Sequence, residues 1–244
     1  MFIIKLDAIG STNSFLKEYI KEHHPDNFTT VVAELQTQGR GQMGTNWESQ
    51  KGKNLTFSVF IKKYIINPQN IFDLNCVITT SILYVLKKHK IPDLSIKWPN
   101  DILSANKKIV GILIENSIKA NAQIESIIGI GINVNQKNFD QIPNASSIYN
   151  ILGHEIDKDE LLTEILEVLK TNFDNYAING ANYYWSLFHD NLYKKNIPSI
   201  FFNHNTQTEF VGTIKKVTSN GLLEIELADK SINHFGIKEI SIIR

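Results

Sequence analysis

Residues 39–57 read GRGQMGTNWESQKGKNLTF and place glycines at Gly39, Gly41 and Gly44, the G-x-G-x-x-G spacing of a dinucleotide-binding turn. Such a turn follows a strand and opens an amphipathic helix at the third glycine, so that a pyrophosphate sits on the helix N-terminus. The β-branched, apolar segment Thr29–Leu35 supplies the strand, but no apolar side chains at helical spacing follow Gly44. The sequence therefore predicts a long glycine-rich loop between two strands, the second being LTFSVFIK. Structureless loops of this length in compact domains are usually functional.

The composition limits the classes of protein to which the chain can belong. Its 244 residues include 25 basic and 25 acidic side chains, so no overall field recruits nucleic acid or an anionic membrane. No segment approaches the ~18 apolar residues of a membrane-spanning helix, and no signal sequence is recognisable. The single cysteine, Cys76, excludes an internal disulfide and indicates a reducing compartment, which predicts a cytoplasmic protein. The 7 histidines show no metal-ligand spacing, so no tightly bound metal is expected and the ligands of any metal ion are unknown.

Hydrophobic periodicity predicts several helices that pack against a sheet. The first begins after a cap at Ser11 or Thr12, and the second covers Ile71–His89. A third begins at Asp157, where Glu160 three residues later is typical of a capping box. A shorter helix is expected around Tyr184, Trp185 and Phe188.

Two apolar segments predict neighbouring strands. They are KKIVGILIENS at 107–117 and AQIESIIGIGINVN at 122–135, joined by a polar turn around Lys119–Ala122. Because both faces of IVGILIE are apolar, this strand is expected to be covered on both sides. The core is therefore expected to be α+β, a mixed sheet with helices packed on it.

From Ile197 onward the pattern changes to period two with frequent turn residues. The dipeptide Asn220-Gly221 indicates a hairpin. Four or five short strands in ~45 residues are typical of a small β-barrel. We therefore expect two domains, a catalytic one over residues 1–195 and a small one over residues 196–244, with the boundary in KKNIP.

Four polar or glycine-bearing clusters fall at the ends of the expected elements, where ligands bind in sheets of this kind. Each has a structural alternative: helix capping, a mobile surface loop, an ordinary Asn-Asp turn, and, for Asn133, a strand-end cap. The clusters are STN at 11–13, QTQGRGQMGTNW at 36–47, KWPND at 97–101 leading to KK at 107–108, and GIGIN at 129–133.

The second and fourth clusters favour a binding function over these alternatives. In the loop, glycines allow backbone N–H groups to approach an anion closely, and Arg40 adds a permanent charge with a planar donor fork. A tryptophan in such a loop, Trp47, usually covers something flat or apolar. The alternating glycines of GIGIN lie within an expected strand, where they indicate that another group approaches the backbone.

Together these motifs resemble the biotin–protein ligase family. The shared pattern is S-T-N, Q-x-x-G-R-G-x-x-G-x-x-W-x-S-x-x-G-x-N-L, K-W-P-N-D, K-x-x-G-I-L-x-E and G-x-G-I-N, in that order across Ile9–Val134. The tail resembles the small SH3-like C-terminal domain of that family. The resemblance implies a class II synthetase-like catalytic domain, in a form that lacks the N-terminal DNA-binding domain of some relatives.

The resemblance also implies a reaction. Members of the family join biotin to ATP, giving biotinyl-5′-adenylate and pyrophosphate, with Mg²⁺ as cofactor. They then transfer biotin to one lysine of the biotin carboxyl carrier domain of a carboxylase. The glycine-rich loop would close over the intermediate, because an acyl-adenylate open to water is hydrolysed.

Site residues are carried over from the family motifs by position. Arg40 and Lys108 are the implied catalytic residues. The implied biotin-binding residues are Ser11, Thr12, Asn13, Gln36, Gly39, Arg40, Gly41, Gln42, Lys108, Gly111, Gly129 and Gly131, of which the last three would give the biotin ring room. The implied ATP-binding residues are Arg40, Trp47, Lys97, Asn100, Asp101, Lys108 and Asn133.

Two features depart from the family. Many relatives carry further arginines in the loop, where this chain has Gln42, Met43 and Thr45, so phosphate binding is expected to depend more on Lys97 and Lys108. No helix-turn-helix segment precedes the first strand, so we expect no DNA binding or repression of transcription. A homodimer is compatible with the sequence. The alternatives are a lipoate or octanoyl ligase or transferase of the same fold and a catalytically silent biotin- or nucleotide-binding module.

Overall fold

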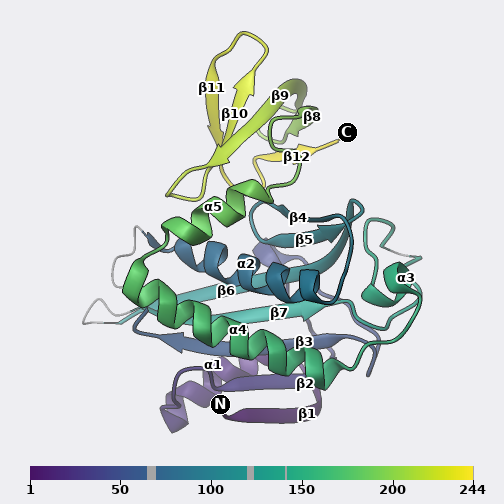
Figure 1. The fold of residues 1–244 in the computed structure, drawn as a ribbon, viewed down its shortest axis with the longest axis vertical. Coiled ribbons are helices and arrows are strands. Elements are labelled where there is room, and N and C mark those ends of the chain that lie inside the picture. The colour runs from purple at the N-terminus through teal and green to yellow at the C-terminus, as the bar shows by residue number, and fades with distance from the viewer. Residues whose placement is uncertain (65–69, 120–123, 141, 244) are drawn as a thin grey trace.

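The structure is a computed structural model that describes residues 1–64, 70–119, 124–140 and 142–243. Its centre is a seven-stranded mixed sheet in the order β1-β2-β3-β7-β6-β5-β4 (Figure 1). Strands β1 and β2 are parallel, and the other neighbours are antiparallel. The strands are β1 (Ile3–Ile9), β2 (Thr30–Gln36), β3 (Leu55–Lys62), β4 (Leu94–Lys97), β5 (Asp101–Ser104), β6 (Lys107–Ile118) and β7 (Ile124–Ile132).

The sequence-predicted helices are confirmed. They are α1 (Thr12–His23), α2 (Asp73–Lys88), α4 (Lys158–Asn179) and α5 (Asn182–Asp190), and a short α3 (Ile148–Leu152) adds to them. Ser11 caps α1, since its side chain accepts from the Ser14 N–H. Asp157 caps α4 through its carboxylate, which accepts two N–H groups. The predicted turn at Lys119–Ala122 lies almost wholly outside the described residues.

The helices cover the two faces of the sheet unequally. Helices α2 and α4 pack on one face and bury one large apolar core. On the other face, α1 contacts β2, β3 and β7, where Leu16 packs with Val31, Phe60 and Ile127. The main contacts of α1 are with these three strands rather than with β6, β5 and β4, which leaves room on this second face for a loop and a ligand.

A second, antiparallel sheet forms a small C-terminal β domain in the strand order β11-β10-β9-β8-β12. The predicted hairpin is present, with a turn over residues 218–222 in which Gly221 adopts φ 80°. The sheet packs against the core: the Trp98 indole donates to the Gly221 carbonyl at 2.9 Å. Its strands are β8 (Pro198–Asn203), β9 (Thr208–Val217), β10 (Leu223–Leu227), β11 (Ile232–Phe235) and β12 (Ile240–Ile242).

Across the described residues, no helix is both long and apolar enough to span a membrane.

One buried carboxylate ties three helices together. Asp73, at the start of α2, accepts from the Tyr176 hydroxyl of α4 at 3.0 Å and from the Trp185 indole of α5 at 2.7 Å. Burial, and then the Asp73 charge, raise the pKa of Tyr176, which therefore stays a neutral donor.

We expect Asp73→Ala to lower the free energy of unfolding by roughly 2–4 kcal/mol, because it leaves two donors without their partner. Asp159→Ala, which removes an exposed ion pair with Lys5, is the control and should cost about 1 kcal/mol or less. Urea unfolding measures both. Equal losses in the two variants would contradict this account of Asp73.

Candidate active site

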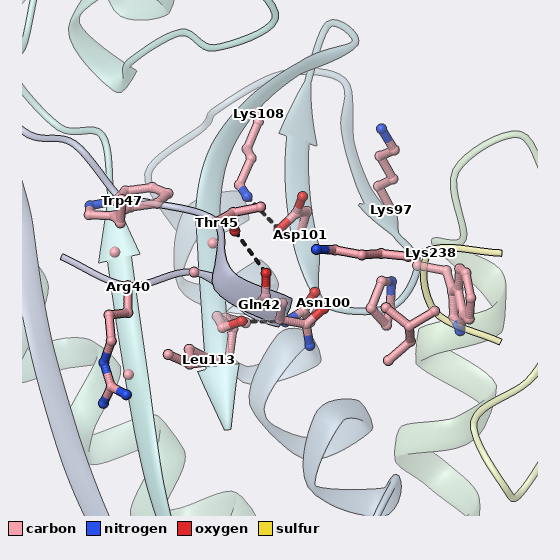
Figure 2. Close-up of a pocket in the computed structure, with 18 of the residues that line it drawn as sticks. Arg40, Gln42, Thr45, Trp47, Lys97, Asn100, Asp101, Lys108, Leu113 and Lys238 are labelled. Carbon is pink, nitrogen blue, oxygen red and sulfur yellow. Dashed lines mark hydrogen bonds and ion pairs between the residues drawn. The ribbon is translucent and has the colours of Figure 1, made fainter. Parts of the chain in front are cut away.

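A cavity of about 650 Å³ opens on the second face of the sheet, between the glycine-rich loop, the β4–β5 turn and the C-terminal sheet (Figure 2). It brings together most of the sequence-predicted site residues from segments far apart in the chain. Those that line it are Ser11, Thr12, Asn13, Gln36, Arg40, Gly41, Gln42, Trp47, Lys97, Asn100, Asp101, Lys108, Gly111, Gly129 and Gly131.

The floor of the cavity consists of a strip of glycine backbone and the Trp47 indole that lies on it. Gly111 of β6 pairs directly with Gly131 of β7. A Cβ atom would lie 2.4 Å from the Trp47 ring at Gly131 and 2.8 Å from it at Gly111. The tryptophan thus lies flat on the sheet, as the sequence suggested, and the space over these two glycines is filled by this indole. At Gly129, a Cβ atom would instead meet the Asn13 amide at 2.4 Å.

A polar network forms the end of the cavity nearest α1. The N-terminus of this helix supplies Thr12, and β2 supplies Gln36. The side-chain oxygen Oε1 of Gln36 accepts from the Thr12 N–H at 2.8 Å and from the Thr12 hydroxyl at 3.1 Å. The Ser58 hydroxyl of β3 lies within hydrogen-bond distance of Thr12 Oγ1 and Asn13 Oδ1, at 2.7 and 2.6 Å. Such a network of neutral donors and acceptors suits a small, uncharged polar group.

Arg40 is paired within the protein. Its Nη2 lies 3.0 Å from Glu115 Oε2, and the same oxygen accepts from the Asn13 amide at 2.7 Å. Figure 2 shows the Arg40 side chain directed away from Lys108. An anion in the cavity must therefore compete with Glu115 for this guanidinium.

The two consecutive lysines differ as their alternation along a strand requires. The Lys108 ammonium lies 2.8 Å from Asp101 Oδ1 and 5.6 Å from the centroid of the Trp47 ring, and the residue lines the cavity. Lys107 is exposed and is not among the lining residues. Of the two lysines, Lys108 therefore faces the cavity and Lys107 does not.

The β4–β5 turn positions two further polar groups. Asn100, in the turn itself, is buried and donates from its amide to the Ile112 carbonyl. Asp101 is the first residue of β5 rather than part of the turn. Lys97, at the end of β4, has no ion-pair partner among the described residues.

Two sequence-predicted residues do not line the cavity. Asn133 is buried, and its amide donates to the Ser146 carbonyl at 3.0 Å, which fits the alternative of a cap after the end of β7. A Cβ atom at Gly39 would lie 2.2 Å from the Trp47 carbonyl oxygen, so this glycine serves the packing of the loop on itself.

Sequence reasoning missed several residues of the site. Ser58 lies in a strand that reads only as apolar and β-branched, and Glu115 belongs to a quoted motif without an assigned role. Residues of the C-terminal sheet also line the cavity, among them Ile237 and Lys238. No spacing rule connects these positions to the loop, so only the fold could reveal them.

Comparisons with known proteins agree with this geometry. Residues 6–133 match the Biotin/lipoate A/B protein ligase family. The chain is 29% identical over 239 residues to the bifunctional ligase/repressor BirA of Bacillus spizizenii, covering 93% of this chain and 73% of that one. It is 27% identical over 172 residues to the biotin–[acetyl-CoA-carboxylase] ligase of Mycobacterium tuberculosis, covering 68% and 63%.

Among solved structures, the chain resembles the biotin protein ligase of Aquifex aeolicus in complex with biotin and ATP. The TM-score is 0.80 at 26% identity, over 100% of this chain and 99% of that one. The family match covers more than half of the 244 residues, and it includes the polar network, the glycine-rich loop and both glycine-bearing strands. The chain belongs to the Biotin/lipoate A/B protein ligase family.

Proposed function

We propose that the chain is a biotin–protein ligase. It activates biotin with ATP to give biotinyl-5′-adenylate and pyrophosphate, and then transfers biotin to a lysine of a carboxylase carrier domain. The observation that carries this proposal is that one cavity holds a neutral polar network at one end and a lysine–carboxylate pair at the other, with the Trp47 indole on a glycine pair between them. The similarity to biotin ligases over almost the whole chain supports biotin as the acid.

Biotin and ATP would bind at opposite ends of the cavity. Ser11, Thr12, Asn13 and Gln36 would hold the uncharged ureido end of biotin, oriented by Ser58. The biotin carboxylate would then lie toward Lys108. A carboxylate is a poor electrophile, so adenylation supplies a leaving group, and the charge that develops on the α-phosphate needs fixed cations and N–H donors.

The nucleotide would occupy the end formed by the β4–β5 turn. Trp47 and Asn100 would flank the adenine, while Lys97 and Lys108 face the phosphates. Arg40 would join them on leaving Glu115. Asn133 is left out of this assignment because Ser146 already engages its amide.

A magnesium ion suits the same end of the cavity. Mg²⁺ in nucleotide enzymes is held by one or two carboxylates together with substrate phosphates. Asp101 is the one carboxylate among the described residues that line the cavity, so it fits this role. When bound, the ion would neutralise charge on the phosphates.

The loop over residues 37–53 would act as a lid. Its tip lies over the cavity, and the lining residues Arg40, Gly41, Gln42 and Trp47 belong to it. We expect ligand contacts to order it further and to exclude water from the acyl-adenylate.

The partner in the second step would be a biotin carboxyl carrier protein or domain. We expect no specific binding of double-stranded DNA, because acidic and basic side chains balance. We also propose a cytoplasmic location, in keeping with the single cysteine. We place the boundary between the catalytic and C-terminal domains between residues 195 and 196.

The function is tested by incubating the chain with ATP, labelled biotin and an unmodified carrier domain. We expect biotin-dependent release of pyrophosphate, followed by label on one carrier lysine. Lipoate and octanoate, offered in place of biotin, should release little pyrophosphate. Preference for either of these acids would favour the lipoate-ligase alternative, and binding without pyrophosphate release would favour a silent binding module.

We expect Lys108→Ala to slow adenylation by roughly 10²–10³-fold, as for loss of one preorganised donor. Transfer from preformed biotinyl-adenylate should suffer less, because its phosphate charge is already in place. Lys107→Ala is the matched control and should stay near wild type. The two half-reactions are measured separately, and near-normal adenylation by Lys108→Ala would remove this lysine from the catalytic residues.

A further inference from the structure

The C-terminal sheet brings a lysine to the mouth of the cavity. Lys238 lies in the turn between β11 and β12 and is one of the lining residues. The turn is closed by its own hydrogen bonds: the Gly236 N–H donates to the Glu239 carboxylate at 2.6 Å, and the Glu239 N–H donates to the Gly236 carbonyl at 3.2 Å. A fixed turn thus carries the base of this long side chain.

The Lys238 ammonium donates to the Met43 carbonyl at 2.6 Å. Figure 2 shows the side chain extending from the C-terminal segment toward the short turn that holds Gln42. Among the described residues, this is the one hydrogen bond between residues 37–53 and the C-terminal sheet.

The loop tip has little else to hold it closed. Met43 is 66% exposed and adopts φ 51° within the turn Gln42–Gly44. Within the loop, Thr45 closes this turn by donating from its hydroxyl to the Gln42 carbonyl at 2.9 Å. The loop's own cationic side chains form ion pairs away from the tip: Arg40 with Glu115, Lys51 with Asp7, and Lys53 with Glu155. A charged donor from outside the loop is therefore well placed to fix its position.

We propose that Lys238 is a positioning residue that latches the tip of the glycine-rich loop over the cavity, so that biotinyl-adenylate is retained until transfer. This inference rests on the proposed function. In this proposal both sheets contribute residues to the closed site, because Lys238 belongs to the C-terminal domain. Lys238 has no ion-pair partner among the described residues, so its charge is available for this contact.

The backbone conformation of Lys238 determines which substitutions test its side chain without straining the turn. Its φ of 67° lies in the left-handed region, which asparagine tolerates better than most residues. Lys238→Asn therefore removes the reach and the charge without adding backbone strain, whereas Lys238→Arg keeps a charged donor. Lys230→Asn is the matched control. Lys230 lies in the turn between β10 and β11 of the same β domain, is exposed and has φ 70°. It pairs with Glu226 and does not line the cavity.

The first measurement is release of labelled biotinyl-adenylate from its isolated complex into an unlabelled chase. Lys238→Asn should release it roughly tenfold faster, as expected for loss of one charged hydrogen bond. Lys238→Arg and Lys230→Asn should stay near wild type. Unchanged release in Lys238→Asn overturns the latch, and so does a raised KM for ATP with unchanged release, which would mean that the ammonium binds phosphate instead.

The second measurement is trypsin cleavage after Arg40 without ligands. Lys238→Asn should be cut faster than wild type and Lys230→Asn should not, with all variants first shown to be folded by thermal unfolding. Equal cleavage in the two asparagine variants counts against the latch. Because this assay needs no adenylate, it tests the latch even if the wild-type chain makes none, in which case the proposed function is the claim that fails.

Discussion

The site depends on one constraint within the central sheet: Gly111 and Gly131 face each other on neighbouring strands. Glycine within strands weakens a sheet, because it costs conformational entropy and packs no side chain. Here it opens a flat strip of backbone in the middle of an otherwise crowded face. Any Cβ atom at these positions would collide with the Trp47 indole, so the path of the glycine-rich loop depends on both glycines.

The asymmetry of helix packing leaves room above this strip for the Trp47 indole and a ligand. One face of the sheet is sealed by α2 and α4, whereas α1 covers only part of the other. The N-terminus of α1 then becomes one wall of the cavity, and the β4–β5 turn becomes the opposite wall. The glycine-rich loop and the C-terminal sheet complete the enclosure. Neutral recognition and charge stabilisation are thereby separated along one cavity, as joining an acid to a nucleotide requires.

Two cations of the site are already paired with carboxylates, whereas Lys97 and Lys238 have no ion-pair partner among the described residues. Glu115 neutralises Arg40, and Asp101 neutralises Lys108. Isolated cations would be costly to desolvate beneath a closing loop, and these carboxylates reduce that cost before substrate arrives. Glu115 also orients the Asn13 amide, so it couples the polar end of the cavity to the loop cation.

Local sequence signals predicted much of this architecture, because their causes are local. Ser11 and Asp157 cap helices through groups only two or three residues away. The apolar periodicity predicted α2 and the β6–β7 pair. The motif resemblance predicted that most of the residues now found around the cavity belong to one site. Contacts between residues far apart in the sequence could not be predicted in this way. No local pattern around Asn133 indicates that its amide donates to the Ser146 carbonyl. No local pattern around Trp47 indicates which glycines its indole covers. Lys238 and Met43 are 195 positions apart, and only the docking of two sheets brings them together.

We propose that the Trp47 indole, lying on Gly111 and Gly131, forms the floor of the adenylation site. The most direct test is the rate of biotinyl-adenylate formation by Gly131→Ala, in which the new methyl group displaces the indole. Ile128→Val, one methylene smaller on the opposite face of the same strand, controls for stability. We expect Gly131→Ala to fold and its rate to fall roughly 10²-fold, because small misplacements near reacting groups slow a reaction by about this much, while Ile128→Val stays near wild type. A folded Gly131→Ala protein that forms the adenylate at the wild-type rate would contradict the account.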